Sequence, residues 1–270
     1  MVKISGGALS QLLIPQVPIV LQRRMVEMID SVTVMECDIK ASIVKLQRVR
    51  QGALLAELVS VARAEPSPGW VRMQLKDIVP SVEYGISEPL NREAFGAPVL
   101  RMNNIQDGQV DVGELRYCPG PVPERLILRR EDVLFNRTNS IEHVGKAAMW
   151  RGELPTATFA SYLVRLIPDR QRVTPEFLVE WLMHPLIRRR VRSISTVAVQ
   201  QVNVNPSRLR ELEIDLPVDL AEQRRIVATL EACDEQIGRE NEELNKLREL
   251  KQGLVDDLLS GRAAVSTVLA

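Results

Sequence analysis

Two short segments of this chain are rich in side chains that can form hydrogen bonds with the edges of flat polar groups such as bases. Residues 134–140 combine amide, guanidinium and hydroxyl groups, and residues 195–205 carry four further amide side chains. The second segment follows residues 188–192, of which four are arginines. Asn and Gln can bind adenine through two hydrogen bonds, Arg can bind guanine in the same way, and Arg also holds phosphates. The combination predicts a surface that binds nucleic acid.

Both features also have simpler explanations. Asn, Ser and Thr are common in turns because their side chains hydrogen-bond to the neighbouring backbone. A run of arginines can be the solvated face of a helix. The binding hypothesis therefore requires the fold to bring these segments together.

Other chemistry has little support in the sequence. The histidines are His143 and His184, and neither lies in the context of a Cys or Ser nucleophile. The chain has no P-loop and no glycine-rich nucleotide motif, and Asn-Pro-Ser-Arg at 205–208 does not match the Asn-Pro-Pro-aromatic motif of an adenine methyltransferase. We predict a protein that is not an enzyme and that binds no cofactor and no metal.

Composition limits the class of protein further. The 270 residues allow one large domain or two small ones, and 35 basic residues balance 35 acidic residues. Zero net charge argues against a bulk nucleic-acid coat but allows a local basic face. Three scattered cysteines without a CxxC pair support neither a disulfide framework nor a zinc site. The apolar stretch 12–21 is too short to cross a membrane, so we expect a cytoplasmic protein.

The elements that must position the polar segments are marked by an internal repeat. The motifs Gln-Arg-Arg at 22–24, Lys-Leu at 45–46 and Gln-Gly at 51–52 each recur 201 residues later. Solenoid repeats are shorter, about 20–50 residues. The sequence therefore predicts two copies of one helical element on either side of another domain, rather than two unrelated amphipathic helices.

Each copy has the spacing of a coiled coil. In the second copy Leu230, Ile237 and Leu244 fall seven apart, and a second series follows the same period. Arg50 and Lys251 occupy the same repeat position, where a cation weakens pairing and helps to fix the register. Helices of about 38 residues would be about 55 Å long. The positions predicted to pair the helices or dock partners are Ile29, Ile43, Leu46, Arg50, Ile226, Leu230, Ile237, Leu244, Leu247 and Lys251.

The residues between the copies predict a mixed, mostly β domain. Short β-type runs are separated by Gly, Pro and Asn, and Asp107-Gly108 is typical of a hairpin turn. Residues 175–183 predict a helix with Thr174 as its N-cap and proline at its first position. We predict an α+β fold, in which this domain is flanked by two long helices that form an antiparallel coiled coil.

A further set of motifs points to a known family. They are Leu-Pro at 216–217, Ala-Glu-Gln-Arg-Arg-Ile-Val at 221–227, Leu-Lys-Gln-Gly-Leu at 250–254, Leu-Leu-Ser-Gly at 258–261, and the segments 69–78, 99–108 and 132–146. With these motifs the chain resembles the specificity (S, HsdS) subunit of type I restriction-modification systems. A full S subunit has two target recognition domains, whereas this chain has one. The expected organisation is the end of a preceding recognition domain (1–21), a spacer helix (22–63), a recognition domain (64–216), a second spacer helix (217–262) and a tail (263–270).

The resemblance implies a division of labour. The recognition domain reads one half of a split site in double-stranded DNA, and the helices set the gap between the halves. The helices also dock the methyltransferase (M) subunits, and the restriction (R) subunit joins through the complex, so the S subunit performs no catalysis. A homodimer could restore two recognition domains. The alternative is a coiled-coil scaffold or half-subunit that acts through protein contacts without reading DNA.

The residues predicted to contact DNA come from several parts of the recognition domain. They are Tyr84, Ser87, Arg101, Asn103, Asn136, Arg137, Thr138, Asn139, Ser140, Lys146, Arg189, Arg192, Thr196, Gln200, Gln201 and Asn203.

Overall fold

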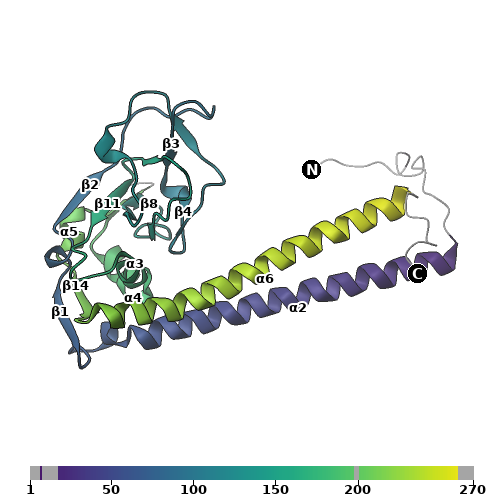
Figure 1. Ribbon diagram of the computed structural model, residues 1–270, viewed down its shortest axis with the longest axis horizontal. Coiled ribbons are helices and arrows are strands. Elements are labelled where there is room, and N and C mark those ends of the chain that lie inside the picture. Colours follow the sequence, from purple (N-terminus) through teal and green to yellow (C-terminus); the bar gives the residue numbers. More distant parts are fainter. Residues whose placement is uncertain (1–6, 8–17, 198–200, 261–270) are drawn as a thin grey trace. The chain divides into compact units, whose positions relative to one another are not determined.

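The computed structural model describes residue 7 and the ranges 18–197 and 201–260 (Figure 1). The chain divides into two compact units. One unit, the stalk, pairs the residues up to Arg50 with those from Ala232, and the other, the head, is Gln51–Glu231. The expected end of a preceding domain at 1–21 lies mostly outside the described residues, and the expected tail at 263–270 lies wholly outside them.

Two long helices run antiparallel in the stalk, as predicted (Figure 1). They are α2 (Ile19–Glu57) and α6 (Leu220–Ser260). The predicted seam positions are buried or half-buried, whereas most positions on the opposite helix faces are exposed. In both helices, these positions therefore lie on the less exposed side. No helix in the described part of the chain has the length and apolar character needed to cross a membrane.

Charged and polar groups cross the stalk seam at three levels. Glu36, only 8% exposed, accepts from Lys251 Nζ at 3.4 Å. At a second level, Arg50, the last α2 residue assigned to the stalk, donates from Nε to an Asp234 carboxylate oxygen at 2.6 Å. Between these levels Ser42 Oγ lies 3.1 Å from a Glu240 carboxylate oxygen. A slip by one heptad would replace Lys251 by an apolar residue opposite Glu36, so these pairs favour one register.

Both helices have ends that differ from the sequence prediction. The first helix was expected at 22–63, but α2 ends at Glu57 and is followed by the 3-10 helix η1 (Val59–Ala62). The second was expected to start at 217, but the last strand of the head continues to Pro217. The carboxylate of Asp219 then accepts from the backbone N–H of Ala221 and caps the first turn of α6.

The head contains short strands in several small sheets. The strands are β1 (Trp70–Gln74), β2 (Ser81–Tyr84), β3 (Ala97–Leu100), β4 (Ile105–Gln106), β5 (Gln109–Val110), β6 (Arg116–Cys118), β7 (Val133–Asn136), β8 (Thr138–Asn139), β9 (Ala147–Met149), β10 (Thr158–Phe159), β11 (Leu163–Ile167), β12 (Thr196–Val197), β13 (Val202–Asn203) and β14 (Glu213–Pro217). The largest sheet has the order β2-β11-β7-β9, with antiparallel neighbours. β1 pairs separately with β14, and β3 lies between β10 and β6.

Short helices and one tight hairpin complete the head. The helices are η2 (Leu75–Asp77), η3 (Met102–Asn104), η4 (Glu124–Leu126), α3 (Pro175–Met183), α4 (Pro185–Ser193) and α5 (Pro206–Arg210). α3 has the predicted bounds, and Thr174 Oγ1 caps it by accepting from the backbone N–H of Phe177. The predicted turn joins β4 to β5, with positive φ angles at Asp107 and Gly108.

Two apolar cores lie on opposite faces of the largest sheet. Phe135 and Val164 belong to the core that also contains Trp181 of α3. Leu134 and Leu163, their neighbours along the strands, belong to the second core. Side chains alternate between the two faces of a strand, so β7 and β11 are buried on both sides. The strands that lead into the polar segments are therefore held from two directions.

Arg165 ties the largest sheet to the loop that precedes β7. Its side chain is 8% exposed and forms ion pairs with Glu83 of β2 and Asp132, the latter at 2.6 Å. It also donates to the backbone oxygens of Ile127 and Arg125. Because a buried guanidinium needs partners for most of its donors, this arrangement fixes the edge strand β2 against β11.

The side chain of Gln223 joins three segments of the head by hydrogen bonds. It belongs to the second copy of the repeated Gln-Arg-Arg motif and is fully buried. Its amide oxygen accepts from the backbone N–H of Thr174 at 2.9 Å, and its amide nitrogen donates to the carbonyls of Arg172 and Pro217. Gln22, the same residue in the first copy, is exposed. The same residue of the repeated motif is therefore buried in the second copy and exposed in the first.

The Glu36 side chain makes the stalk sensitive to acid. Burial alone would raise its pKa, but Lys251 and Lys40 more than offset this and hold the pKa below the ordinary 4.5. The stabilisation from Glu36 is complete above pH 4.5 and is lost as the pH falls through the folded pKa. Circular dichroism during acid titration should show a smaller loss of stalk helicity in Glu36→Gln than in the wild type. Glu235→Gln, on an exposed face of α6, is the matched control, and equal acid sensitivity in all three proteins would refute the assignment.

Candidate nucleic-acid interface

The two amide-rich segments meet in one small sheet. β8 pairs with β13, so that Thr138 lies opposite Asn203 and Asn139 opposite Val202. β12 adds the third strand by pairing with β13. The backbone N–H of Val204 also donates to the carbonyl of Arg137 at 2.8 Å. Segments that are more than 60 residues apart in the chain thus form a continuous surface.

Arg137 lies between β7 and β8, and its side chain contacts three other parts of the head. One guanidinium nitrogen, Nη2, donates to the side-chain oxygen of Asn203 at 2.9 Å. The other, Nη1, donates to the carbonyl of Ser161 at 3.3 Å. The guanidinium carbon lies 5.2 Å from the centre of the Tyr84 ring, within range of a cation–π interaction. Arg137 is therefore in direct contact with two other predicted residues, Tyr84 and Asn203.

Two predicted DNA contacts are corrected by the structure. Asn136 is fully buried, and its amide nitrogen donates to the carbonyl of Met102 at 3.3 Å. Thr138 is 6% exposed. Both face inward because side chains alternate along the strand, which leaves Arg137 and Asn139 on the outer side. Asn136 and Thr138 support the surface and do not form part of it.

The β4–β5 hairpin borders the same region. Lys146 Nζ lies 2.9 Å from the side-chain oxygen of Gln106 and 3.4 Å from an Asp107 carboxylate oxygen. Asn103 is exposed, and its carbonyl accepts from the Gln106 amide nitrogen at 2.9 Å. The hairpin thus holds the ammonium group of Lys146 beside the strand that follows the Asn136–Ser140 segment.

The arginines of α4 point in different directions. Arg188 is 8% exposed and donates to the carbonyl of Glu142 at 2.8 Å. Burial, and then the charge of Arg192, lower its pKa to about 10, against the opposite effect of Asp107. Arg189 is exposed and lines a groove of about 330 Å³ together with Val61. The four arginines of residues 188–192 therefore do not form one continuous basic surface, because Arg188 is buried and Arg189 is exposed.

The remaining predicted residues have mixed positions. Arg101 is half-buried, and its pKa is lowered by burial and by Arg116, with Glu114 opposing. It therefore belongs to a separate group of charges. Gln200 lies outside the described residues. Those that are exposed or half-exposed are Ser87, Asn139, Ser140, Arg192, Thr196 and Gln201.

Sequence reasoning missed three residues that shape this surface. Ser161 supplies the carbonyl that holds Arg137, Tyr162 exposes 43% of its surface next to it, and Gln106 holds Lys146. Gln106 could have been suspected because it precedes the Asp-Gly turn. The other two carry no local pattern, since their place depends on the pairing of β11. Within the described residues, no group of three or more His, Cys, Asp or Glu side chains could hold a metal ion.

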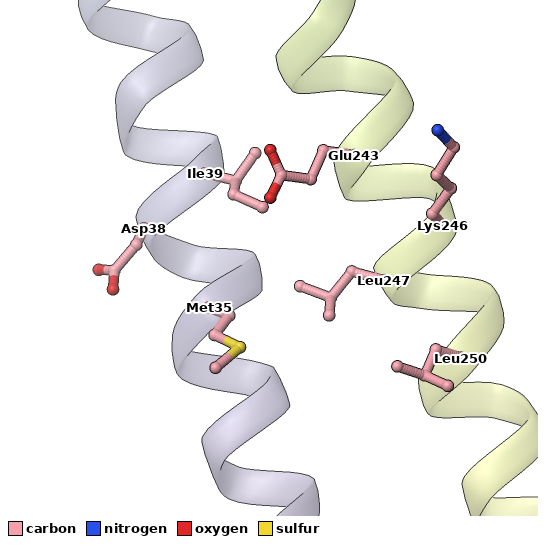
Figure 2. Close-up of a pocket in the computed structure, with 7 residues that line it drawn as sticks. All are labelled: Met35, Asp38, Ile39, Glu243, Lys246, Leu247 and Leu250. Carbon is pink, nitrogen blue, oxygen red and sulfur yellow. The ribbon is translucent and has the colours of Figure 1, made fainter.

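The stalk has a groove of its own between the two helices. It measures about 390 Å³ and is lined by Met35, Asp38 and Ile39 of α2 and by Glu243, Lys246, Leu247 and Leu250 of α6. Figure 2 shows Ile39 and Leu247 turned into the space between the helices, whereas Asp38 and Lys246 point away from it. Leu250 is 63% exposed and Met35 is 52% exposed. The Glu243 carboxylate also points into this space, so the groove combines apolar side chains with one charged group. Exposed apolar side chains bordered by charges are typical of a surface that binds another protein.

A pair of antiparallel helices with a mostly β domain between them in sequence is the architecture of a specificity subunit. Residues 68–249 match the family model of the type I restriction modification DNA specificity domain. The match covers more than half of the chain, which therefore belongs to the family of type I restriction-modification specificity subunits. This agrees with the prediction of a non-catalytic subunit.

Relatives and solved structures support this assignment. The chain is 31% identical over 196 residues to the putative type I restriction enzyme MjaX specificity subunit of Methanocaldococcus jannaschii, covering 71% of the chain and 45% of that protein. It is 24% identical over 256 residues to the EcoBI specificity subunit of Escherichia coli, covering 84% and 52%. It thus spans about half the length of the curated relatives that it matches.

The likeness to solved structures concerns the fold. The HsdS subunit from Thermoanaerobacter tengcongensis matches with a TM-score of 0.55 at 22% identity, over 96% of this chain and 63% of that one. The S subunit from M. genitalium matches with a TM-score of 0.55 at 13% identity, over 88% and 60%. The predicted α+β fold with long flanking helices is confirmed.

His184 is the N-cap residue of α4, the helix that carries the arginines. Its ring nitrogen Nδ1 accepts from the backbone N–H of Leu186 at the start of α4. Burial, and then Arg190, lower its pKa from 6.5 to about 4. Between pH 6.5 and about 4, His184 is therefore protonated in the unfolded chain but neutral in the folded chain. Because the unfolded state binds the extra proton, the free energy of unfolding falls as the pH drops through this range. Urea unfolding should show a loss of roughly 2–3 kcal/mol from this residue.

His184→Asn should remove that loss, since an amide oxygen can cap the helix and does not titrate. His143→Asn, at an exposed position, should keep the wild-type pH dependence. An unchanged pH dependence in His184→Asn would show that other groups are responsible.

Proposed function

We propose that the head reads one half of a bipartite site in double-stranded DNA. The observation that carries the proposal is the single sheet formed by the two amide-rich segments, with Arg137 directly before its edge strand β8 and in contact with Asn203 and Tyr84. Amide groups in an exposed surface match the donor and acceptor pattern of the major groove. Family membership supports the same function.

Charges around this sheet supply contacts of a second kind. The Lys146 carbonyl accepts from the backbone N–H of Asn136, two residues before β8. Arg189 and Arg192 are neighbours three residues apart on α4, the helix that leads to β12. Cations of this type bind phosphates and set the affinity, whereas the amide groups select the bases. The neutral net charge allows such local contacts and does not favour binding along the whole surface.

The stalk docks the methyltransferase subunits through its apolar groove. The groove offers exposed Leu250 and Met35 to a partner, and family membership supports an M subunit as that partner. The restriction subunit then joins through the complex. A homodimer of this chain would present two recognition domains and read a symmetric split site.

Selection from randomised duplexes, with the methyltransferase subunits present, tests DNA reading directly. The expected result is one enriched half-site. If no motif is enriched, the chain is a scaffold that acts through protein contacts.

Phosphate contacts can be separated from base contacts by salt dependence. Arg192→Ala should lower affinity about equally for all sequences and reduce the slope of log K against log salt by about 1. Arg239→Ala, an exposed arginine of the stalk, should leave the slope unchanged. A changed base preference in Arg192→Ala would assign this arginine to base reading instead.

Docking of the M subunit on the stalk can be tested by introducing a charged side chain into the groove. Leu250→Glu should weaken binding of the M subunit at least tenfold in a titration, because a carboxylate would be buried against apolar side chains. Gln252→Glu adds the same charge two residues away, outside the groove, and should bind normally. Equal effects of the two substitutions would place the docking surface elsewhere. Circular dichroism checks that both stalks stay helical.

A further inference from the structure

We propose that Asn203 reads an adenine of the half-site and that Arg137 is the positioning residue that orients its amide. The inference rests on the proposed DNA-reading function and assigns separate roles within it. In this arrangement Tyr84 holds Arg137, Arg137 holds Asn203, and Asn203 meets the base.

Arg137 is held by several parts of the head at once. Its guanidinium lies over the Tyr84 ring of β2, and its two terminal nitrogens donate to the Ser161 carbonyl and to the Asn203 oxygen. Its backbone N–H donates to the carbonyl of Tyr162, and its own carbonyl accepts from Val204. Within the described part of the chain, its Nε is buried and has no hydrogen-bond partner. A side chain fixed in this way is rigid and has few donors left for a base.

The contact with Arg137 decides which way the Asn203 amide faces. An asparagine amide can be turned by half a rotation, which exchanges its donor and acceptor ends. Because a guanidinium has donors and no acceptor, only the oxygen of Asn203 can face Arg137. The amide nitrogen is therefore directed to the other side. Asn203 is partly exposed at the end of β13, where this nitrogen can reach a ligand.

This orientation fits adenine. The amide nitrogen can donate to adenine N7, and the second lone pair of the oxygen can accept from the N6 amino group. The hydrogen bond from Arg137 pulls electron density toward the oxygen and makes the N–H groups better donors. Guanine presents an acceptor at O6, where adenine presents a donor, so the Asn203 oxygen would face another acceptor.

Two substitutions separate reading from positioning. Asn203→Asp keeps an oxygen that can pair with Arg137 but removes the donor, and a carboxylate accepts from cytosine N4. Arg137→Lys keeps the charge but loses the planar fork that holds both Ser161 and Asn203. Arg170→Lys, an exposed arginine elsewhere in the head, is the control. Selection from randomised duplexes is performed with the full chain and the methyltransferase subunits.

The expected result concerns a single position of the half-site. Asn203→Asp should change the preferred base there from adenine to cytosine, and Arg137→Lys should reduce the adenine preference at the same position about tenfold. The variant with both substitutions should lose no more of the adenine preference at that position than the single variant with the larger loss, because the two residues act through one contact. Thermal melting of each variant shows whether the head stays folded.

Other outcomes overturn the inference in distinguishable ways. If Arg137→Lys alters a different position from Asn203→Asp, Arg137 reads a base itself. An unchanged preference in Asn203→Asp would remove Asn203 from base reading while leaving the proposed function in place. If the wild type enriches no motif, the proposed function fails, and this inference fails with it.

Discussion

The buried amide of Gln223 is the constraint on which the head depends. Its three hydrogen bonds join the first turn of α6 to the end of β14 and to the start of α3. Ile226 and Leu230 follow on the same helix and enter the main core beside Trp181. A buried amide without partners is costly, so all three segments must meet in one arrangement. This residue therefore fixes the first turn of α6 within the head.

The polar surface owes its shape to the apolar strands beneath it. β7 and β11 are covered on both faces, and Arg165 adds a charged clamp to the edge strand that carries Tyr84. The chain leaves β7 at Asn136 and continues directly into β8. A well-packed sheet thus delivers Arg137 to a defined position, which is what discrimination between bases requires.

The helices could be predicted because a shared offset and a heptad period act over many residues, and Lys251 and Arg50 were recognised from their repeat position. The surface was harder to predict. A strand pattern shows that Asn136 and Arg137 face opposite ways, but only the tertiary fold decides which one faces inward. Ser161 and Gln223 carry no local pattern, since their roles depend on distant backbone groups. The helix ends differed from prediction because β14 and η1 compete for the flanking residues.

The antiparallel seam of the stalk also restricts how its length can evolve. An insertion in α2 between Glu36 and Arg50 would change the spacing of these two residues, so that only one of the pairs Glu36–Lys251 and Arg50–Asp234 could stay in register. Insertions that preserve both pairs must come as matched changes in the two helices, each a whole heptad of about 10 Å. Lengths of such stalks should therefore be inherited in discrete steps, with two coupled mutations for each step.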